Sequence, residues 1–317
     1  MARALLRIGT RGSALALAQA AEVRARLGAA HAELAASDAI ETVVIKTTGD
    51  AVRDRSLWAI GGKRLFTKEI EEALLDGRID LAVHSLKDLE TFLPESLVLA
   101  AHLPREDPRD AFFSPRAPRL AALPAGAAVG TSSPRRRAQV LHARPDLRVL
   151  PLRGNVETRL SKLAAGAVDA TLLALAGVKR LGLEGRVTAV IEPEEMLPAV
   201  AQGAIGVEIR RDDASAAHYL AGIDDAATAQ RVTAERAVLA ALGGSCRTPA
   251  AALAELSAGT LHLRAMILRP DGSEKIFTER RGAASDAAAL GRDAGEELRA
   301  RARPGFFDAD MAEENPA

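Results

Sequence analysis

The sequence predicts an α/β protein with two α/β lobes, each built on a mixed, mostly parallel sheet, and a smaller α+β domain at the C-terminal end. Short apolar segments alternate with helical patterns over the first two thirds of the chain. The segment GRIDLAV at 77–83 is mirrored by GAVDATL at 166–172, which indicates that the two lobes share one plan. Beyond residue 226, consecutive hairpin-like strands and a final helix follow.

Proline and charge mark the domain boundaries. Residues 104–110 are charged and rich in proline, so we place a boundary there. The apolar stretch 198–209 reads as a strand that crosses back to the first lobe. The predicted division is 1–104 plus 200–222 for the first lobe, 105–199 for the second lobe and 223–317 for the C-terminal domain.

Composition limits the classes of function. With 317 residues and 48% hydrophobic residues, the chain can bury several cores. Lys+Arg and Asp+Glu number 42 each, which gives no electrostatic case for binding nucleic acid or a membrane surface. Arg3 and Arg7 interrupt any export-signal core and there is one cysteine, so we expect a cytoplasmic protein. The histidines show no metal-ligand spacing, and no metal is expected.

The first strand, 5–9, runs into Ser13, a natural N-cap for a helix over 14–27 that Gly28 closes. A helix N-terminus presents free N–H groups, and Arg11 adds a guanidinium beside it, a combination that suits an anion. An ordinary turn with a solvated arginine is the alternative.

A second strand, 41–46, leads into a long loop over 47–62 that has the length of a lid. Apolar residues from 66 to 74 then mark one face of a helix, which Gly77 ends.

The buried strand 79–83 brings Lys87 and Asp88 to the same sheet edge as Arg11. Ligands of α/β proteins bind at the carboxyl ends of strands. The lysine could hold an anion while the carboxyl exchanges protons with a reacting amine. A solvated Lys-Asp turn is the alternative.

The second lobe repeats this pattern. A strand at 127–130 leads through the capping residues 131–133 to Pro134, which suits the first helical position. Arginines 135–137 then open the helix, although positive charge is unfavourable at that end of a helix dipole. Three arginines placed there indicate a nearby anion.

A strand at 148–152 is followed by Arg153 and Asn155, and then by a helix over 156–165 that carries Arg159. The mirrored strand at 166–172 leads to a segment that ends in Arg180. Two lobes with basic strand ends that face a cleft predict an anion clamp.

The single cysteine, Cys246, follows a helical pattern at 233–242 that ends at Gly243. Glycine before the thiol and Pro249 after it describe an exposed loop, and Arg247 would favour the thiolate. A helix cap followed by a small packed residue is the alternative.

The remaining C-terminal pattern predicts strands and one last helix, at 252–256, 261–268, 275–279 and about 284–302, followed by a frayed tail.

Together these residues resemble the porphobilinogen deaminase family, also called hydroxymethylbilane synthases, of tetrapyrrole biosynthesis. The matches run in order through nearly the whole chain. They are RIGTRGS at 7–13, KE at 68–69 with the stretch to KD at 87–88, REDPRDA at 105–111, GTSSPRR at 130–136, LRGN at 152–155, LPAVAQG at 197–203 and GGSC at 243–246.

The resemblance implies that Cys246 carries a dipyrromethane cofactor through a thioether. It implies that the enzyme deaminates and joins four molecules of its small-molecule substrate, porphobilinogen, and that water then releases the linear hydroxymethylbilane. Asp88 matches the catalytic carboxyl, which assists protonation of the leaving amine and stabilises the cationic pyrrole. A monomer is what the family suggests.

The resemblance also implies a set of residues that hold the acetate and propionate groups of the pyrrole rings. They are Arg11, Ser13, Lys87, Thr131, Ser133, Arg135, Arg136, Arg153, Asn155, Arg159 and Arg180. One dicarboxylate ring would not need six arginines, whereas a growing polycarboxylate would.

Three positions depart from the family pattern. They are Ala59, Arg64 and Glu90, which stand where lysine, glycine and proline are common. Two other classes of function remain open at this point. One is an anion-binding protein or ligand-sensing domain with the bilobal architecture of periplasmic binding proteins, and the other is a cysteine hydrolase, for which the sequence offers no specific base.

Overall fold

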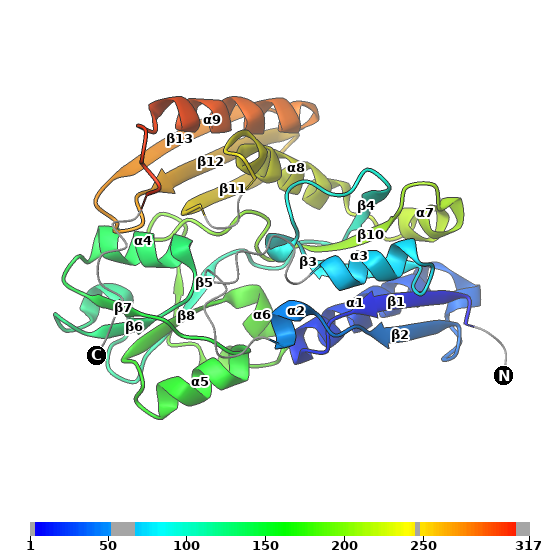
Figure 1. The fold of residues 1–317 in the computed structure, drawn as a ribbon, viewed down its shortest axis with the longest axis horizontal. Helices are drawn as coiled ribbons and strands as arrows, with labels where there is room; N and C mark the ends of the chain where they lie inside the picture. The colour runs from blue at the N-terminus through cyan, green and yellow to red at the C-terminus, as the bar shows by residue number, and fades with distance from the viewer. Residues whose placement is uncertain (1–3, 52–66, 245–247, 309–317) are drawn as a thin grey trace. The chain divides into compact units, whose positions relative to one another are not determined.

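The computed structural model describes residues 4–51, 67–244 and 248–308, and the described strands form three sheets (Figure 1). The first sheet has the order β2 (Ile40–Val44), β1 (Leu6–Thr10), β3 (Leu81–Ser85), β10 (Ile205–Arg210), β4 (Leu97–His102). The second has the order β7 (Arg148–Leu150), β6 (Ala128–Gly130), β8 (Ala170–Ala174), β5 (Asp110–Phe113), β9 (Ala189–Ile191). The third has the order β11 (Ala250–Ser257), β12 (Thr260–Leu268), β13 (Lys275–Ala283). The predicted fold class is confirmed.

The two five-stranded sheets follow one plan. In the first, β1 pairs in parallel with β2 and β3, and β10 pairs antiparallel with β3 and β4. In the second, β6 pairs in parallel with β7 and β8, and β5 pairs antiparallel with β9. In each sheet a strand from another part of the chain therefore lies beside the third parallel strand: β10 lies beside β3, and β5 lies beside β8. The predicted return of residues 198–209 to the first sheet is confirmed.

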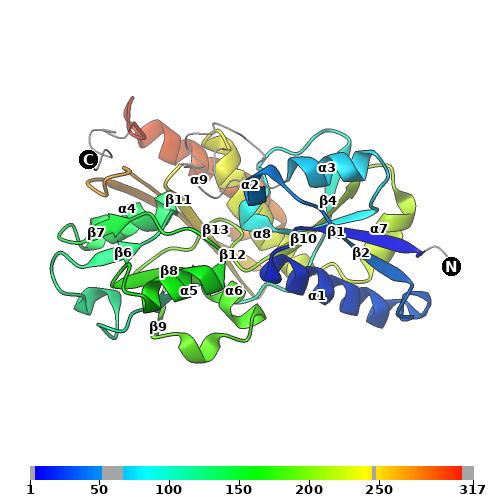
Figure 2. The ribbon, with the colours of Figure 1, turned by 60° about the horizontal axis from the view of Figure 1, so that its bottom comes forward.

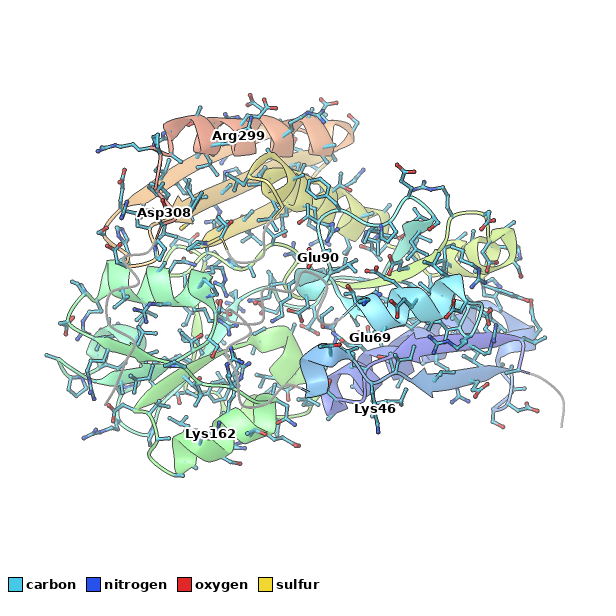
Figure 3. All side chains as sticks on the ribbon, in the orientation of Figure 1. Lys46, Glu69, Glu90, Lys162, Arg299 and Asp308 are labelled. Atoms are coloured by element: carbon cyan, nitrogen blue, oxygen red, sulfur yellow. The ribbon has the colours of Figure 1, made fainter. Side chains whose placement is uncertain are left out.

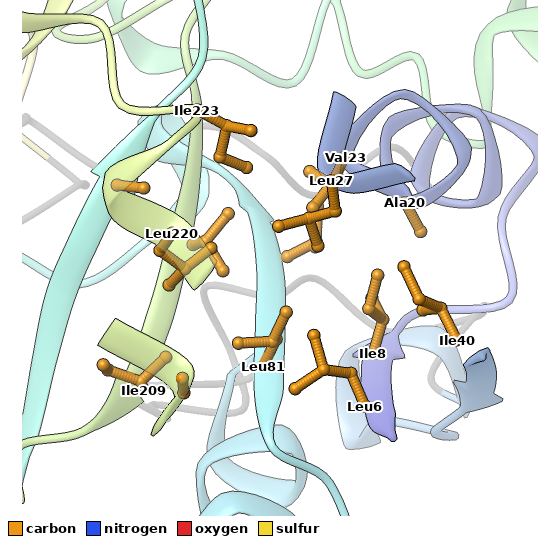
Figure 4. Packing of buried hydrophobic residues seen from close by; sticks show 14 of the residues in the cluster. Leu6, Ile8, Ala20, Val23, Leu27, Ile40, Leu81, Ile209, Leu220 and Ile223 are labelled. Carbon is orange, nitrogen blue, oxygen red and sulfur yellow. The ribbon is translucent and has the colours of Figure 1, made fainter. Parts of the chain in front are cut away.

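Strand alternation explains how helices cover both faces of the first sheet (Figure 2). The helix α1 (Ala14–Ala30) packs Val23 and Leu27 against Leu81 on one face, as Figure 4 shows. The helix α3 (Lys68–Leu75) packs against Ala82, the next residue of β3, on the other face. Both faces of β3 are thus buried, and this packing fixes the position of the carboxyl end of the strand.

The mirrored segments share an aspartate that ties strands together. Asp80 accepts hydrogen bonds from the Arg7 backbone N–H at 2.9 Å and from the Arg7 guanidinium at 2.7 Å. Asp169 accepts from the Ala128 N–H at 2.8 Å and from Arg116 at 2.5 Å. In each sheet the carboxylate therefore joins the third parallel strand to the first.

The third sheet is an antiparallel meander, as the hairpin pattern predicts. The helix α9 (Ala287–Arg301) covers it, and α8 (Ala226–Ala241) precedes it in the chain (Figure 1). A Cβ on Gly291 of α9 would lie 2.1 Å from the Ala234 carbonyl oxygen, so glycine permits a close helix contact here.

Several elements differ from the prediction. The helix α1 continues past Gly28 to Ala30, and its C-cap is His31. Gly28 lies inside the helix, where its lack of a side chain leaves room for the turn that follows the helix. Residues 175–180 form the short helix α6 (Leu175–Arg180). The sequence did not predict β4, β5, β9 or the helix α7 (Ala214–Ala221), whose short apolar runs fit either a strand or a helix.

Grouped by contacts, the chain forms two units. The first comprises Met1–Pro108, Ala174–Gly185 and Ala201–Thr233, and the second comprises Arg109–Leu173, Arg186–Val200 and Ala234–Ala317. The helix α6 belongs to the first unit because Gly177 packs against Leu15 of α1. The division into three domains stays a prediction. In the described part of the chain, no helix combines the length and the apolar character that crossing a bilayer requires.

Candidate functional site

A small pocket lies at the carboxyl ends of β1 and β3 in the first unit, with a volume of about 60 Å³. Seven of its ten lining residues are polar, and the lining consists of Arg11, Ser13, Leu15, Ala16, Gln19, Thr67, Val83, His84, Ser85 and Asp88. Parallel strands end at the same edge of a sheet, and the structure accordingly brings Arg11, Ser13 and Asp88 together.

The start of α1 forms one wall of this pocket. The Ser13 Oγ accepts a hydrogen bond from the Ala16 N–H at 3.3 Å, which confirms the predicted N-cap. Arg11 is half-buried in the turn before it. A helix N-terminus and an adjacent guanidinium both favour negative charge, so this wall suits a carboxylate.

Asp88 ends a short 3₁₀ turn, Leu86–Asp88, that follows β3 directly. Leu86 is buried, and its N–H donates to the Ala204 carbonyl oxygen at 3.1 Å, which anchors the turn to the sheet. Asp88 itself is exposed, and Lys87 is half-buried. The carboxylate is thus held on a fixed turn and is open to a ligand.

Two wall residues escaped the sequence reasoning. Gln19 and Ser85 form a reciprocal pair, in which the Gln19 amide donates to Ser85 Oγ at 2.7 Å and the Ser85 hydroxyl donates to Gln19 Oε1 at 3.0 Å. Gln19 is 4% exposed in an alanine-rich helix. An amide on the buried face of such a helix was the sequence feature that could have identified it.

A further pair was missed behind the pocket. The His84 Nε2 lies 3.1 Å from Glu208 Oε2, and both side chains are buried. Glu208 interrupts the apolar segment 205–209, and a charged residue in a buried strand requires a partner.

In the second unit, Arg135 and Arg136 are buried against an internal anion. Asp110 on β5 accepts from Arg135 Nη2 at 2.8 Å and from Arg136 Nη2 at 2.7 Å. The remaining terminal nitrogens donate to the backbone carbonyls of Leu197 and Leu172. Burial lowers the pKa of Arg135, and the Asp110 carboxylate opposes that shift.

Within the unit, Arg135 and Arg136 of α4 (Pro134–Ala143) both pair with Asp110. The third arginine, Arg137, is exposed and donates to the Val149 carbonyl oxygen. Binding of a ligand carboxylate by Arg135 and Arg136 stays a prediction.

The polar capping residues of this unit have local roles. Thr131 Oγ1 accepts from the Ser133 N–H at 3.2 Å, and Ser133 Oγ accepts from the Arg136 N–H at 3.4 Å as the N-cap of α4. Asn155 caps α5 (Val156–Ala164) by accepting from the Thr158 N–H at 2.8 Å. These contacts fix the loops after β6 and β7.

The other basic residues lie at loop and helix ends. Arg153 and Arg159 are half-buried near the start of α5, the helix that carries Lys162 (Figure 3), and Arg159 Nε donates to the Gly154 carbonyl oxygen at 2.8 Å. Arg180 belongs to the first unit, where Nε lies 3.2 Å from Glu22 Oε2 and Nη2 donates to the Gly203 carbonyl oxygen.

Cys246, Ala59 and Arg64 lie outside the described residues. The predicted end of the helix before Cys246 is confirmed, because α8 ends at Ala241 and Gly243 has a φ of +94°. Glu90 is half-buried in the segment after Asp88 (Figure 3). Over residues 4–51, 67–244 and 248–308, no three His, Cys, Asp or Glu side chains gather as a metal site would require.

Comparison with protein-family models gives two matches. The model for "Porphobilinogen deaminase, dipyromethane cofactor binding domain" matches residues 6–218, and that for "Porphobilinogen deaminase, C-terminal domain" matches residues 229–300. Together they span the three sheets.

Similar relatives carry the same name. The porphobilinogen deaminase of Paracoccus denitrificans is 60% identical over 96% of both chains, and that of Nitrobacter hamburgensis is 57% identical over 96% of this chain and 95% of its own. The chloroplastic porphobilinogen deaminase of Oryza sativa is 53% identical over 96% of this chain and 86% of its own.

Among solved structures, the methionine-binding protein MetQ aligns with 69% of this chain and 89% of its own at 13% identity and a TM-score of 0.44. A periplasmic substrate-binding protein from Coxiella burnetii aligns with 69% of this chain and 91% of its own at 15% identity and a TM-score of 0.41. On the family models and the identity to curated relatives, the chain belongs to the porphobilinogen deaminase family.

Proposed function

We propose that the chain is a hydroxymethylbilane synthase, a transferase of tetrapyrrole biosynthesis. It joins four porphobilinogen molecules head to tail on a covalent dipyrromethane cofactor and releases ammonia, and water then frees the linear hydroxymethylbilane. The observation that carries this proposal is the match of residues 6–218 to the cofactor-binding domain of the family. The family gives no support to the alternative of an anion-binding protein without catalysis.

Asp88 supplies the acid and base chemistry. In each condensation, a C–N bond of porphobilinogen breaks, a C–C bond forms, and the attacking ring carbon loses a proton as the leaving amine gains one. A carboxyl group at one place can give and take this proton. Its negative charge also stabilises the cationic pyrrole that forms when ammonia leaves. The exposed position of Asp88 at the edge of the pocket supports this role.

Basic and hydroxyl side chains hold the ring carboxylates. In the first unit, Arg11 and Ser13 at the N-terminus of α1 fit this role, because the guanidinium and the helix end both favour an anion. We assign the same role to the other predicted residues, Lys87, Thr131, Ser133, Arg135, Arg136, Arg153, Asn155, Arg159 and Arg180. Asp110 compensates only one of the two charges of Arg135 and Arg136, which supports binding of a further anion near α4.

The dipyrromethane, when bound, supplies the free ring position on which the product is built. We propose Cys246 as its point of attachment, because it is the only thiol of the chain. The adjacent Arg247 favours the thiolate, which is the nucleophilic form.

The test is the intact mass of the freshly expressed protein, alone and after brief incubation with porphobilinogen. We expect a mass above the sequence value by one dipyrromethane, and discrete pyrrole increments once substrate is added. Cys246→Ser should lack both. An unmodified mass in both wild-type samples, from protein shown to be folded, would refute the proposed function.

We also propose that the protein is a cytoplasmic monomer. The similarity to relatives from Paracoccus and Nitrobacter supports a bacterial compartment, whereas the rice and pea relatives are named chloroplastic. Light scattering coupled to gel filtration should give a mass near 33.3 kDa. A mass of twice that value would contradict the monomer.

A further inference from the structure

A buried histidine in the lining of the pocket that holds Asp88 is paired with a buried carboxylate. His84 on β3 stands opposite Gly206 of β10, and Glu208 stands opposite Ala82, so the antiparallel register brings the two side chains together. The His84 Nε2 to Glu208 Oε2 distance is 3.1 Å, and the exposed fractions are 6% and 0%. A carboxylate buried this deeply is stable only beside a proton donor or a positive charge.

The pairing of His84 with Glu208 favours one tautomer of the imidazole. Over the described residues, Glu208 Oε1 has no hydrogen-bond partner, so the imidazole is the group that satisfies this carboxylate. When His84 Nε2 donates to Glu208, the neutral ring has its lone pair at Nδ1. His84 lines the same pocket as Asp88. In this tautomer Nδ1 is the nitrogen that can accept a proton.

We propose that His84 and Glu208 form a proton-exchange pair that acts through Asp88 during chain elongation. The inference rests on the proposed function. The proton lost by the ring carbon in one condensation equals the proton gained by the leaving amine, so no external acid is consumed. Asp88 stabilises the cationic pyrrole only as the carboxylate, so a nearby base has to hold the proton between these events. Nδ1 of His84 accepts it, and Glu208 stabilises the resulting imidazolium, as a buried carboxylate does behind a catalytic histidine. His84 touches no reacting atom and is a positioning residue.

The charges around His84 come from each element next to β3. Glu208 lies on β10, Arg11 follows β1, and Lys87 and Asp88 follow β3 itself. The buried Glu71 lies on α3, which packs against β3. Three carboxylates and two cations therefore lie on the elements around His84. Removal of the Glu208 charge is therefore expected to make the imidazolium less stable.

The experiment compares His84→Gln and Glu208→Gln with the wild-type holoenzyme. Both variants retain hydrogen-bonding groups, but glutamine at 84 cannot exchange protons and glutamine at 208 carries no charge. The matched control is His102→Gln. His102 lies on β4 of the same sheet, and its Nδ1 is 3.3 Å from Asp224 Oδ1. His102 is not among the pocket residues. The measurements are cofactor content by intact mass, the melting temperature, and kcat and KM for porphobilinogen from pH 5 to 9.

We expect His84→Gln to carry cofactor and keep its KM, while kcat falls about 10- to 100-fold, less than the 10²–10⁴ of a direct acid–base group. The pH profile should lose the ionisation that an imidazole contributes between about pH 5 and 8. Glu208→Gln should change the pH profile, and His102→Gln should leave it unchanged.

The inference is overturned if the profiles of both variants superimpose on that of the wild type, or if their loss of kcat equals that of His102→Gln. Rates are expressed per cofactor-bearing molecule, so partial misfolding does not imitate the effect. His84→Asn provides a second variant with a shorter side chain. If the wild type gains pyrrole increments but the variants have the pH profile and kcat of the wild type, only this inference is refuted. If the wild type gains no pyrrole increments, the proposed function is refuted.

Discussion

The two five-stranded sheets hold a fully buried acid at the same topological place but pair it with different partners. Glu208 on β10 and Asp110 on β5 each lie on the strand next to the third parallel strand. Glu208 meets an imidazole, which can change its charge near neutral pH, whereas Asp110 meets two guanidiniums, which cannot. The shared plan therefore fixes where a buried carboxylate lies, and the partner decides whether that place can exchange protons.

From this comparison we expect that substitution of Asp88, the acid at the pocket of the first sheet, lowers activity more than it lowers stability. Asp88→Asn should keep the melting temperature, because Asp88 is exposed. Product formation should fall at least about 100-fold, since the amide cannot exchange the proton of the leaving amine, and the variant should carry cofactor poorly or not at all. The measurements are turnover of porphobilinogen and intact mass, with the exposed Asp38→Asn as control. Near-normal turnover would remove Asp88 from the mechanism.

The buried acid of the second sheet should serve stability instead. Asp110→Asn leaves two buried guanidiniums without their anion, and breaking such a pair destabilises a protein by about 3–5 kcal/mol. The free energy of unfolding in urea measures this effect. The control is Asp146→Asn, which removes an exposed partner of Arg144 and should change little. Equal urea midpoints for the two variants would show that the Asp110 cluster contributes no special stability.

A smaller effect is expected for the aspartate that ties the strands of the second sheet. The pKa of Asp169 is lowered by the Ala128 backbone N–H and then by Arg116, so the folded state favours the ionised form. Its contribution to stability is therefore present above the unfolded pKa of about 3.9 and is lost as pH falls through the lower folded pKa.

Asp169→Asn should accordingly destabilise the protein by about 1–2 kcal/mol at pH 7, and the difference from wild type should shrink below about pH 4. Urea unfolding at pH 7 and pH 3.5 measures both values. A difference that stays constant across this range would mean that the ionised carboxylate is not the stabilising form.

A destabilisation of similar size should be the same in both sheets. Gly77 and Gly166 hold matching places in the mirrored segments, with φ of +66° and +74° and open space around the Cα. Alanine at either position should destabilise by about 1–2 kcal/mol, the strain of a left-handed backbone. Unequal losses in thermal unfolding of Gly77→Ala and Gly166→Ala would show that the two turns are not equivalent.

The pocket edge of the first sheet was predictable because it follows from local rules. Ser13 is a capping residue before a helical pattern, and Asp88 follows a buried strand, so both reach the end of a parallel sheet. The pocket walls were less predictable. Gln19 and Glu208 read as single polar residues among apolar neighbours, and their partners Ser85 and His84 lie far away in sequence.

The sequence by itself determined the parallel strand pattern, the N-caps of helices and the mirrored aspartates, because these depend on neighbours a few residues apart. Only the tertiary structure decided which charges neutralise one another. Arg135 and Arg136 find Asp110 some 25 residues away, and His84 finds Glu208 124 residues away. A buried charge needs a partner of opposite charge or a hydrogen-bonding group. The spacing of residues along the sequence does not show which residue the fold will bring next to it.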